Sequence, residues 1–306
     1  MKRLAFALSS LLGVAPFATA LAQSAAPPTQ QQAQAADTRQ GGTFNAYGSQ
    51  IFYQVSGSGT PLVLIHGYPL NGGLFAYQQA GLASRFQVIT LDLPGFGKSS
   101  PIVGGVGSTA IYARYVIALL DHLGIQKAVI GGHSMGGIIT QEVYREASNR
   151  FAGMILIDTI SQPASIIEQS EWAGFGVQAT RQGVPSVLPN LVPMLLTGNT
   201  LLNIPAVGTA IENIIDEASV SGMQTGAETL ALRPDYRPVL PTISVPTLVL
   251  EGVDDGVYAF PIAQSIQAAI PGATLSLIPD AGHVSIFEQP AAANQAITAW
   301  ADAAKL

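Results

Sequence analysis

The feature that most constrains the fold of this chain is a series of short apolar runs separated by stretches with helical patterning. The runs lie at residues 61–65, 88–91, 128–130, 154–157 and 247–250. A strand without alternation of apolar and polar residues is buried on both faces, as in a parallel sheet covered by helices. We therefore expect an α/β fold with a doubly wound, mostly parallel sheet. A hairpin over residues 43–55, turning near Gly48, precedes it.

The clearest helical stretch follows at residues 109–123. Ser108 or Thr109 is positioned to cap its first turn, and Gly124 follows its last. The interval between the runs at 154–157 and 247–250 is about ninety residues, far longer than an ordinary crossover connection. It predicts a helical cap over residues 161–240, inserted after the sixth strand.

The predicted cap divides the core into residues 42–160 and 241–306. Between residues 174 and 210 the one charged side chain is Arg181. The cap must therefore turn much apolar surface either toward the core or toward a ligand. Four large side chains are candidates for lining a hydrophobic substrate site: Trp172, Phe175, Met194 and Leu195.

The N-terminal segment has the pattern of a secretory signal peptide over residues 1–22. Lys2 and Arg3 precede an apolar stretch at 4–12, and Ala20-Leu21-Ala22 is a small-x-small cleavage site. Residues 23–41 contain few bulky side chains and are typical of a flexible linker. We expect export to the periplasm or the medium, with no stable membrane insertion after processing.

Composition excludes several functions. The 13 basic and 19 acidic residues give a net charge of −6, and Lys and Arg form no cluster, which argues against a nucleic-acid partner. The absence of Cys removes disulfides and thiolate chemistry. Gly97-Lys98-Ser99 lacks the earlier glycine of a phosphate loop, and no convincing strand precedes the Gly-rich residues 105–110. No His and carboxylate spacing is typical of a metal site, so we expect neither cofactor nor metal.

Ser134 is the candidate nucleophile. It is the centre of Gly132-His133-Ser134-Met135-Gly136, which directly follows an apolar strand and precedes a helical pattern. So tight a reversal requires small residues on both sides and leaves the serine Oγ above the strand ends. The helix N-terminus that follows favours developing negative charge.

A serine hydroxyl needs a base, and here the candidate is His283. In the α/β-hydrolase fold, which this turn resembles, the acid and then the base follow the serine along the chain. Three of the four histidines, His66, His122 and His133, come before Ser134. His283 follows it, in a loop between the strand-like residues 274–278 and a helix starting near residue 290.

The acid must lie at a strand end, and Asp255 best fits a loop that turns back toward His283. Asp158, at the end of the preceding strand, is a genuine rival because it faces the same crevice. Asp254 and Glu251 are weaker alternatives. Attack of a serine on a carbonyl group forms a tetrahedral intermediate, whose negatively charged oxygen needs hydrogen-bond donors. We predict that these donors are the backbone N–H groups of Tyr68 and Met135.

The chain resembles the α/β-hydrolase fold superfamily, particularly its small serine esterases, enol-lactonases and haloperoxidase- or perhydrolase-like members. The resemblance runs from about residue 42 to the C-terminus. It rests on His66-Gly67-Tyr68-Pro69-Leu70, Asp92 to Ser99, Gly132 to Gly137, Asp255, and Gly282-His283 with Glu288-Gln289-Pro290. It implies a triad of Ser134, Asp255 and His283. Relatives that use an aspartate nucleophile are excluded, because a serine holds that position.

The expected activity is hydrolysis of a carboxylic ester or lactone with a hydrophobic acyl or alcohol part, through an acyl-enzyme. The expected partner is therefore a small molecule. Perhydrolysis or hydrolysis of a carbon–carbon bond is an alternative, since both use the same triad. A ligand-binding homologue without turnover is the alternative from another class.

Overall fold

The computed structural model of this chain describes residues 40–306. The predicted signal peptide and residues 23–39 of the predicted linker lie outside the described residues and stay predictions. The linker prediction was wrong at its end. Gln40 and Gly41 already belong to the first strand, where they pair with Val55 and Gln54.

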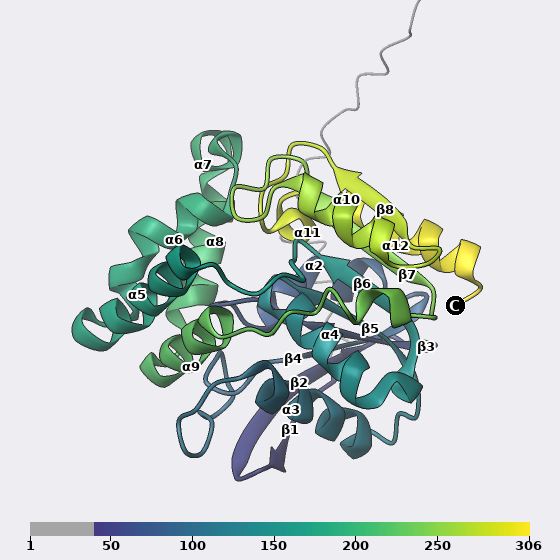
Figure 1. Cartoon of the computed structure of the whole chain (residues 1–306), viewed down its shortest axis with the longest axis horizontal. Helices are drawn as coiled ribbons and strands as arrows, with labels where there is room; N and C mark the ends of the chain where they lie inside the picture. Colours follow the sequence, from purple (N-terminus) through teal and green to yellow (C-terminus); the bar gives the residue numbers. More distant parts are fainter. Residues whose placement is uncertain (1–39) are drawn as a thin grey trace, which may run out of the picture.

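The core is an eight-stranded sheet in the order β1-β2-β4-β3-β5-β6-β7-β8 (Figure 1). β1 and β2 form an antiparallel hairpin, β2 is antiparallel to β4, and every pairing from β4 to β8 is parallel. This confirms the predicted fold class. The strands are β1 Gln40–Ala46, β2 Ser49–Ser56, β3 Thr60–Ile65, β4 Phe86–Leu91, β5 Ala128–His133, β6 Phe151–Ile157, β7 Thr247–Gly252 and β8 Thr274–Ile278.

Helices cover the sheet. Among them, α3 packs on α4, and α2 packs on α12. Ser108 Oγ accepts from Ile111 N and starts α3, as its sequence predicts. Within residues 40–306, no helix has the length and apolar character needed to cross a membrane. These helices are η1 Gly72–Phe75, α2 Ala76–Gly81, α3 Thr109–His122, α4 Met135–Ala147, η2 Ser148–Arg150, η4 Leu240–Thr242, α10 Phe260–Ala269, α11 Ser285–Glu288 and α12 Pro290–Ala304.

The interval between β6 and β7 holds further helices, which gather beside the sheet on one side of the molecule (Figure 1). We call residues 166–231 the helical insertion. Many of its apolar side chains are turned inward, including Trp172, Leu191, Ile211 and Met223, whereas Ile167 and Leu202 are exposed. It lies where the cap was predicted, and the domain boundaries stay a prediction. Its elements are α5 Ile166–Gln182, η3 Val184–Val187, α6 Leu188–Leu195, α7 Gly198–Asn203, α8 Pro205–Asp216 and α9 Val220–Ala231.

The junction between β5 and α4 is packed so closely that two of its glycines admit no side chain. A Cβ on Gly132 would lie 2.1 Å from the carbonyl oxygen of Gly136. A Cβ on Gly136 would lie 2.0 Å from the carbonyl oxygen of Ile65 in β3. Because both obstacles are backbone, no rotamer change relieves them. Glycine at these positions lets α4 begin directly on top of the sheet.

We predict that Gly136→Ala destabilises the protein by about 1–3 kcal/mol, since the methyl group must push α4 away from β3. The measurement is the free energy of unfolding in urea. Gly174→Ala is the matched control, because Gly174 lies in α5 with no heavy atom within 4 Å of the added Cβ. It should stabilise by up to ~1 kcal/mol through helix propensity. Equal effects of the two changes would contradict this account.

Candidate active site

Ser134 occupies the reversal between β5 and α4 in a conformation that non-glycine residues rarely adopt. Its φ is 52° and its ψ is −118°. Two hydrogen bonds hold this backbone: Ser134 N donates to Ile157 O at 2.9 Å, and Thr159 Oγ1 donates to Ser134 O at 2.7 Å. The strained turn is thus fixed from β6 and the loop after it, which directs the side chain away from the strand.

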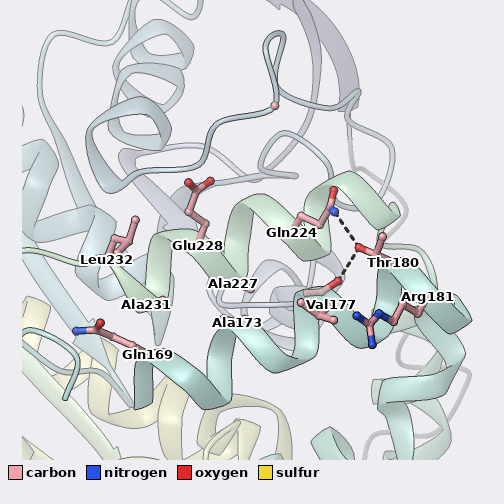
Figure 2. Close-up of a pocket in the computed structure, with 12 residues that line it drawn as sticks. Gln169, Ala173, Val177, Thr180, Arg181, Gln224, Ala227, Glu228, Ala231 and Leu232 are labelled. Carbon is pink, nitrogen blue, oxygen red and sulfur yellow. Dashed lines mark hydrogen bonds between the residues drawn. The ribbon is translucent and has the colours of Figure 1, made fainter. Parts of the chain in front are cut away.

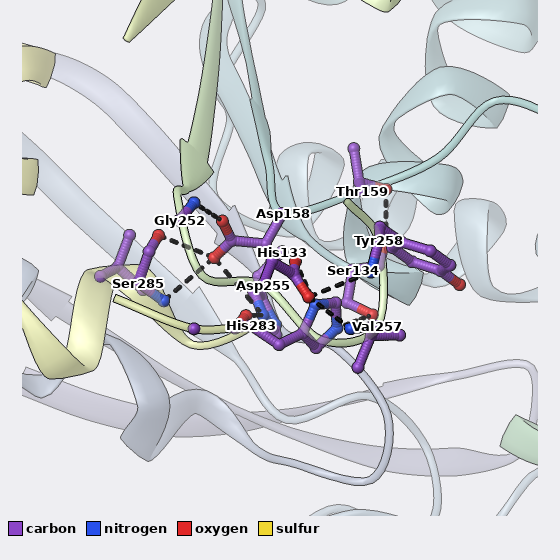
Figure 3. A network of polar contacts seen from close by, with 12 residues as sticks. His133, Ser134, Asp158, Thr159, Gly252, Asp255, Val257, Tyr258, His283 and Ser285 are labelled. Atoms are coloured by element: carbon purple, nitrogen blue, oxygen red, sulfur yellow. Dashed lines mark hydrogen bonds and ion pairs between the residues drawn. The ribbon is translucent and has the colours of Figure 1, made fainter. Parts of the chain in front are cut away.

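The structure brings Ser134, His283 and Asp255 together in one chain of hydrogen bonds (Figure 3). His283 Nε2 lies 2.9 Å from Ser134 Oγ, and His283 Nδ1 lies 2.8 Å from Asp255 Oδ2. A carboxylate only accepts, so Nδ1 carries the proton and Nε2 faces the serine hydroxyl as an acceptor. These residues come from the β5–α4, β8–α11 and β7–α10 connections. The arrangement can take a proton from the serine and stabilise the resulting imidazolium.

Asp255 is held in place by its own loop. Its Oδ1 accepts from Val257 N at 2.7 Å and from Tyr258 N at 3.0 Å, which leaves Oδ2 for His283. Burial raises the pKa of the Asp255 carboxyl, but His283 and the two N–H donors outweigh burial and lower it. Asp255 is therefore ionised at neutral pH.

Asp158, the rival acid, is engaged elsewhere. Its Oδ1 accepts from Gly252 N at 2.9 Å, and its Oδ2 accepts from Ser285 N at 3.1 Å and Ser285 Oγ at 2.7 Å. These bonds join the end of β7 to the start of α11. Within the described chain it makes no hydrogen bond to His283. Asp254 is exposed. The geometry thus places Asp255 at the imidazole, while its catalytic role stays a prediction.

Glu251 lies in a cluster of buried carboxyl groups with Asp158 and Asp255. One oxygen from each of the three lies within 4.8 Å of the others, so a cation would fit the spacing. Both other carboxylates already accept protein donors, whereas no donor of the described residues reaches either Glu251 oxygen. Burial, reinforced by the charges of Asp158 and Asp255, raises the pKa of Glu251 to about 12. A proton on Glu251 therefore relieves the repulsion.

Two further buried histidines, His66 and His133, form hydrogen bonds with the backbone of loops around the site. His66 Nε2 accepts from Leu93 N at 2.8 Å, while Nδ1 donates to Gly67 O at 2.8 Å. Burial lowers the pKa of His66 to about 4, so the ring is neutral and its two hydrogen bonds hold the loop. His133 Nε2 donates to His283 O at 2.6 Å. Burial is the main reason that the pKa of His133 is lowered to about 3, and the charge of the neighbouring His283 is the second. Sequence reasoning missed this support of His283, for which adjacency to Ser134 was the one signal.

The loop after β3 passes very close to Ser134. A Cβ on Gly67 would lie 2.8 Å from Ser134 Cβ, so only glycine permits this approach. Tyr68 follows at once. In the described chain the backbone N–H groups of Tyr68 and Met135 have no protein acceptor. They are free to donate to an oxyanion, and their role as the oxyanion hole stays a prediction.

The four predicted substrate-lining residues lie in two places. Trp172 makes an edge-to-face contact with Tyr68, 6.1 Å between ring centroids, and lies 6.0 Å from the Phe175 ring. Leu195 is buried, and its carbonyl accepts from Val284 N, next to His283. Met194 is 36% exposed. Each pair lies beside a loop of the site, and contact with substrate stays a prediction.

A separate open groove of about 650 Å³ lies between α5 and α9 of the helical insertion (Figure 2). Small residues, including Ala173 and Ala227, form part of its wall, with Arg181 and Glu228 also lining it. Ser134, Asp255 and His283 are not among the residues that line this groove. The groove is therefore distinct from the candidate active site.

We predict that Glu251→Gln stabilises the protein, and increasingly so as pH rises from 5 to 8. In the folded state Glu251 keeps its proton, whereas the unfolded chain releases it above about pH 4.5, so rising pH favours unfolding of the native protein. The slope for one proton is at most ~1.4 kcal/mol per pH unit. Glutamine has no proton to lose. Urea unfolding at several pH values measures the difference.

The control is Glu171→Gln, the same change at an exposed position of α5. A gain for Glu251→Gln that does not grow with pH, or a loss of stability at pH 8, would show that Glu251 is ionised in the fold.

Comparisons with known proteins agree with this geometry. A family model described as the alpha/beta hydrolase fold matches residues 60–200. The 3-oxoadipate enol-lactonase 2 of Acinetobacter baylyi is 30% identical over 259 residues, 84% of this chain and 95% of that protein. A non-heme haloperoxidase of Rhodococcus erythropolis is 29% identical over 255 residues, covering 77% and 90% of the two chains.

Among solved structures, a thermophilic esterase from Thermogutta terrifontis superposes with a TM-score of 0.82 at 34% identity. The match covers 86% of this chain and 97% of that one. These relatives each match more than three quarters of this chain. The chain therefore belongs to the α/β-hydrolase fold superfamily, as a member of its small esterase and lactonase type.

Proposed function

We propose that this protein is a serine hydrolase that cleaves a carboxylic ester or lactone through an acyl-enzyme. The observation that carries the proposal is the continuous hydrogen-bonded chain from Ser134 through His283 to Asp255. A buried serine, imidazole and ionised carboxylate in this order have the geometry that activates a hydroxyl for attack on a carbonyl.

In the proposed mechanism Ser134 Oγ attacks the substrate carbonyl while His283 Nε2 takes the hydroxyl proton. Asp255 stabilises the imidazolium through Nδ1, and the N–H groups of Tyr68 and Met135 donate to the oxyanion. His283 then gives its proton to the leaving oxygen, which yields the acyl-enzyme. A water molecule, deprotonated by His283, then attacks the acyl carbon. His283 returns this proton to Ser134 Oγ as the acyl–oxygen bond breaks, which releases the acid and restores the free serine.

The proposed substrate has a hydrophobic acyl or alcohol part. In support, the stretch from 174 to 210 in the helical insertion carries a single charged side chain, Arg181, and the aromatic ring of Trp172 contacts Tyr68. The relatives named as an enol-lactonase and as an esterase support both substrate classes. An apolar wall favours an apolar substituent because binding removes its surface from water.

A panel of nitrophenyl esters of increasing acyl length, together with lactones, tests this proposal. We expect medium chains to give higher kcat/KM than acetate, since each buried CH₂ adds roughly 0.8 kcal/mol. Ser134→Ala should lower kcat by about 10⁴-fold or more. It should also abolish labelling by a fluorophosphonate. A preference for charged or very short acids would contradict the hydrophobic site.

The haloperoxidase relative favours a second candidate, perhydrolysis, in which hydrogen peroxide replaces water in attacking the acyl-enzyme. Peracid formation from the same esters, measured with and without peroxide, separates the two. Labelling that is absent in the intact protein, or unchanged by Ser134→Ala, would instead favour a ligand-binding protein without turnover.

Asp255→Asn and Asp158→Asn, compared in parallel, identify the acid. We expect Asp255→Asn to lower kcat by about 10³–10⁴-fold, because an amide facing Nδ1 favours the wrong tautomer of His283. Asp158→Asn should cost roughly 100-fold less, since it disturbs only the bonds to Gly252 and Ser285. The measurement is kcat on the preferred ester. A larger loss for Asp158→Asn would reassign the acid.

A further inference from the structure

The end of α6 and the start of α7 in the helical insertion lie against both loops that carry the base and the acid. Leu195 O accepts from Val284 N at 3.3 Å, directly after His283. A Cβ on Gly282 would lie 3.1 Å from Leu195 O and 3.2 Å from Thr197 N. On the acid side, a Cβ on Gly256 would lie 3.7 Å from Met194 O. We call residues 194–197 the bridging segment.

Glu288, the last residue of α11, joins the bridging segment to the His283 loop through one carboxylate. Its Oε2 accepts from Gly282 N at 2.6 Å. Its Oε1 accepts from Thr197 N at 3.0 Å and from Thr197 Oγ1 at 3.1 Å. These three hydrogen bonds connect the bridging segment to the His283 loop through a single side chain.

The link acts on the backbone that carries the catalytic imidazole. Gly282 N, one residue before His283, is held by Glu288, and His283 O is held by His133 Nε2. With the peptide fixed on both sides, the ring reaches Asp255 and Ser134 at hydrogen-bonding distance simultaneously. Displacement of the bridging segment would break the two hydrogen bonds from Thr197 to Glu288 and leave only the one from Gly282 N.

We propose that Glu288 is a positioning residue that makes the place of His283 depend on the helical insertion. The inference rests on the proposed function for its catalytic consequence, because only a hydrolase uses His283 as a base. Its structural part, a mechanical link between residues 194–197 and the His283 loop, stands on the contacts alone. The helical insertion thus acts on the chemistry through its contact with the His283 loop.

Glu288→Gln tests the link, because an amide offers one acceptor oxygen where the carboxylate offers two, and its NH₂ group faces a donor. We expect kcat to fall about tenfold with KM changed less than twofold. A tenfold change is about 1.4 kcal/mol in the barrier. Backbone hydrogen exchange should become faster both at residues 280–285 and at 195–203. The exchange measurement is independent of turnover.

The matched control is Glu228→Gln. Glu228 also joins the insertion to the core, accepting from Gly107 N at 2.9 Å, but its contacts lie away from His283. It should leave kcat and exchange at 280–285 unchanged. Unchanged kcat in Glu288→Gln despite faster exchange at Gly282 would overturn the positioning role. Faster exchange confined to 280–285 would overturn the link.

Thr197→Val covers the case in which Glu288→Gln does not fold. It removes the Thr197 Oγ1 bond to Glu288 together with the cap on Thr200 N at the start of α7, and it leaves the bond from Gly282 N to Glu288 in place. Faster exchange at 280–285 in this variant supports the link, and its absence overturns it. If the wild type shows no Ser134-dependent hydrolysis, the proposed function fails. The paired exchange result then still decides whether the two segments are coupled.

Discussion

The buried hydrogen bond between His283 Nδ1 and Asp255 is the interaction on which the rest of the site depends. It keeps Asp255 ionised inside the protein, fixes the imidazole tautomer, and aims Nε2 at Ser134. Much of the surrounding structure serves these two groups. The strand ends supply their loops, and the glycines around Ser134 allow the loops to converge on one point.

That hydrogen bond lies beside a cluster of buried carboxyl groups, which are rare in a hydrophobic core. Two carboxylates near Asp255, those of Asp158 and Glu251, have raised pKa values because of burial and mutual repulsion. Protonation of Glu251 leaves Asp255 as the group that balances the imidazolium. The protein thus tolerates three acids in one place by keeping charge off at least one of them.

The strands and Ser134 were predictable because their signals are local: uninterrupted apolar runs and a glycine-flanked serine. His283 followed by chain order. Asp255 was preferred over Asp158, and the structure places Asp255 beside the imidazole, while its role as the acid stays a prediction. Asp158 could not be separated by sequence because both acids end neighbouring strands. The roles of Glu251 and His133 were missed, since each depends on partners far away in the chain. The end of the linker was misplaced by two residues, because the first residues of β1, Gln40 and Gly41, give no apolar signal.

Glu288 shows how a family motif takes on a meaning specific to one chain. The motif places a carboxylate at the end of α11, but what its second oxygen contacts depends on the helical insertion. Here that contact is the N-cap of α7, whose hydroxyl and N–H both point at Glu288. Under the proposed function, changes in the insertion therefore act on turnover without touching Ser134, His283 or Asp255. Because the helical insertion contacts the His283 loop, substitutions in the insertion can change rate and specificity together.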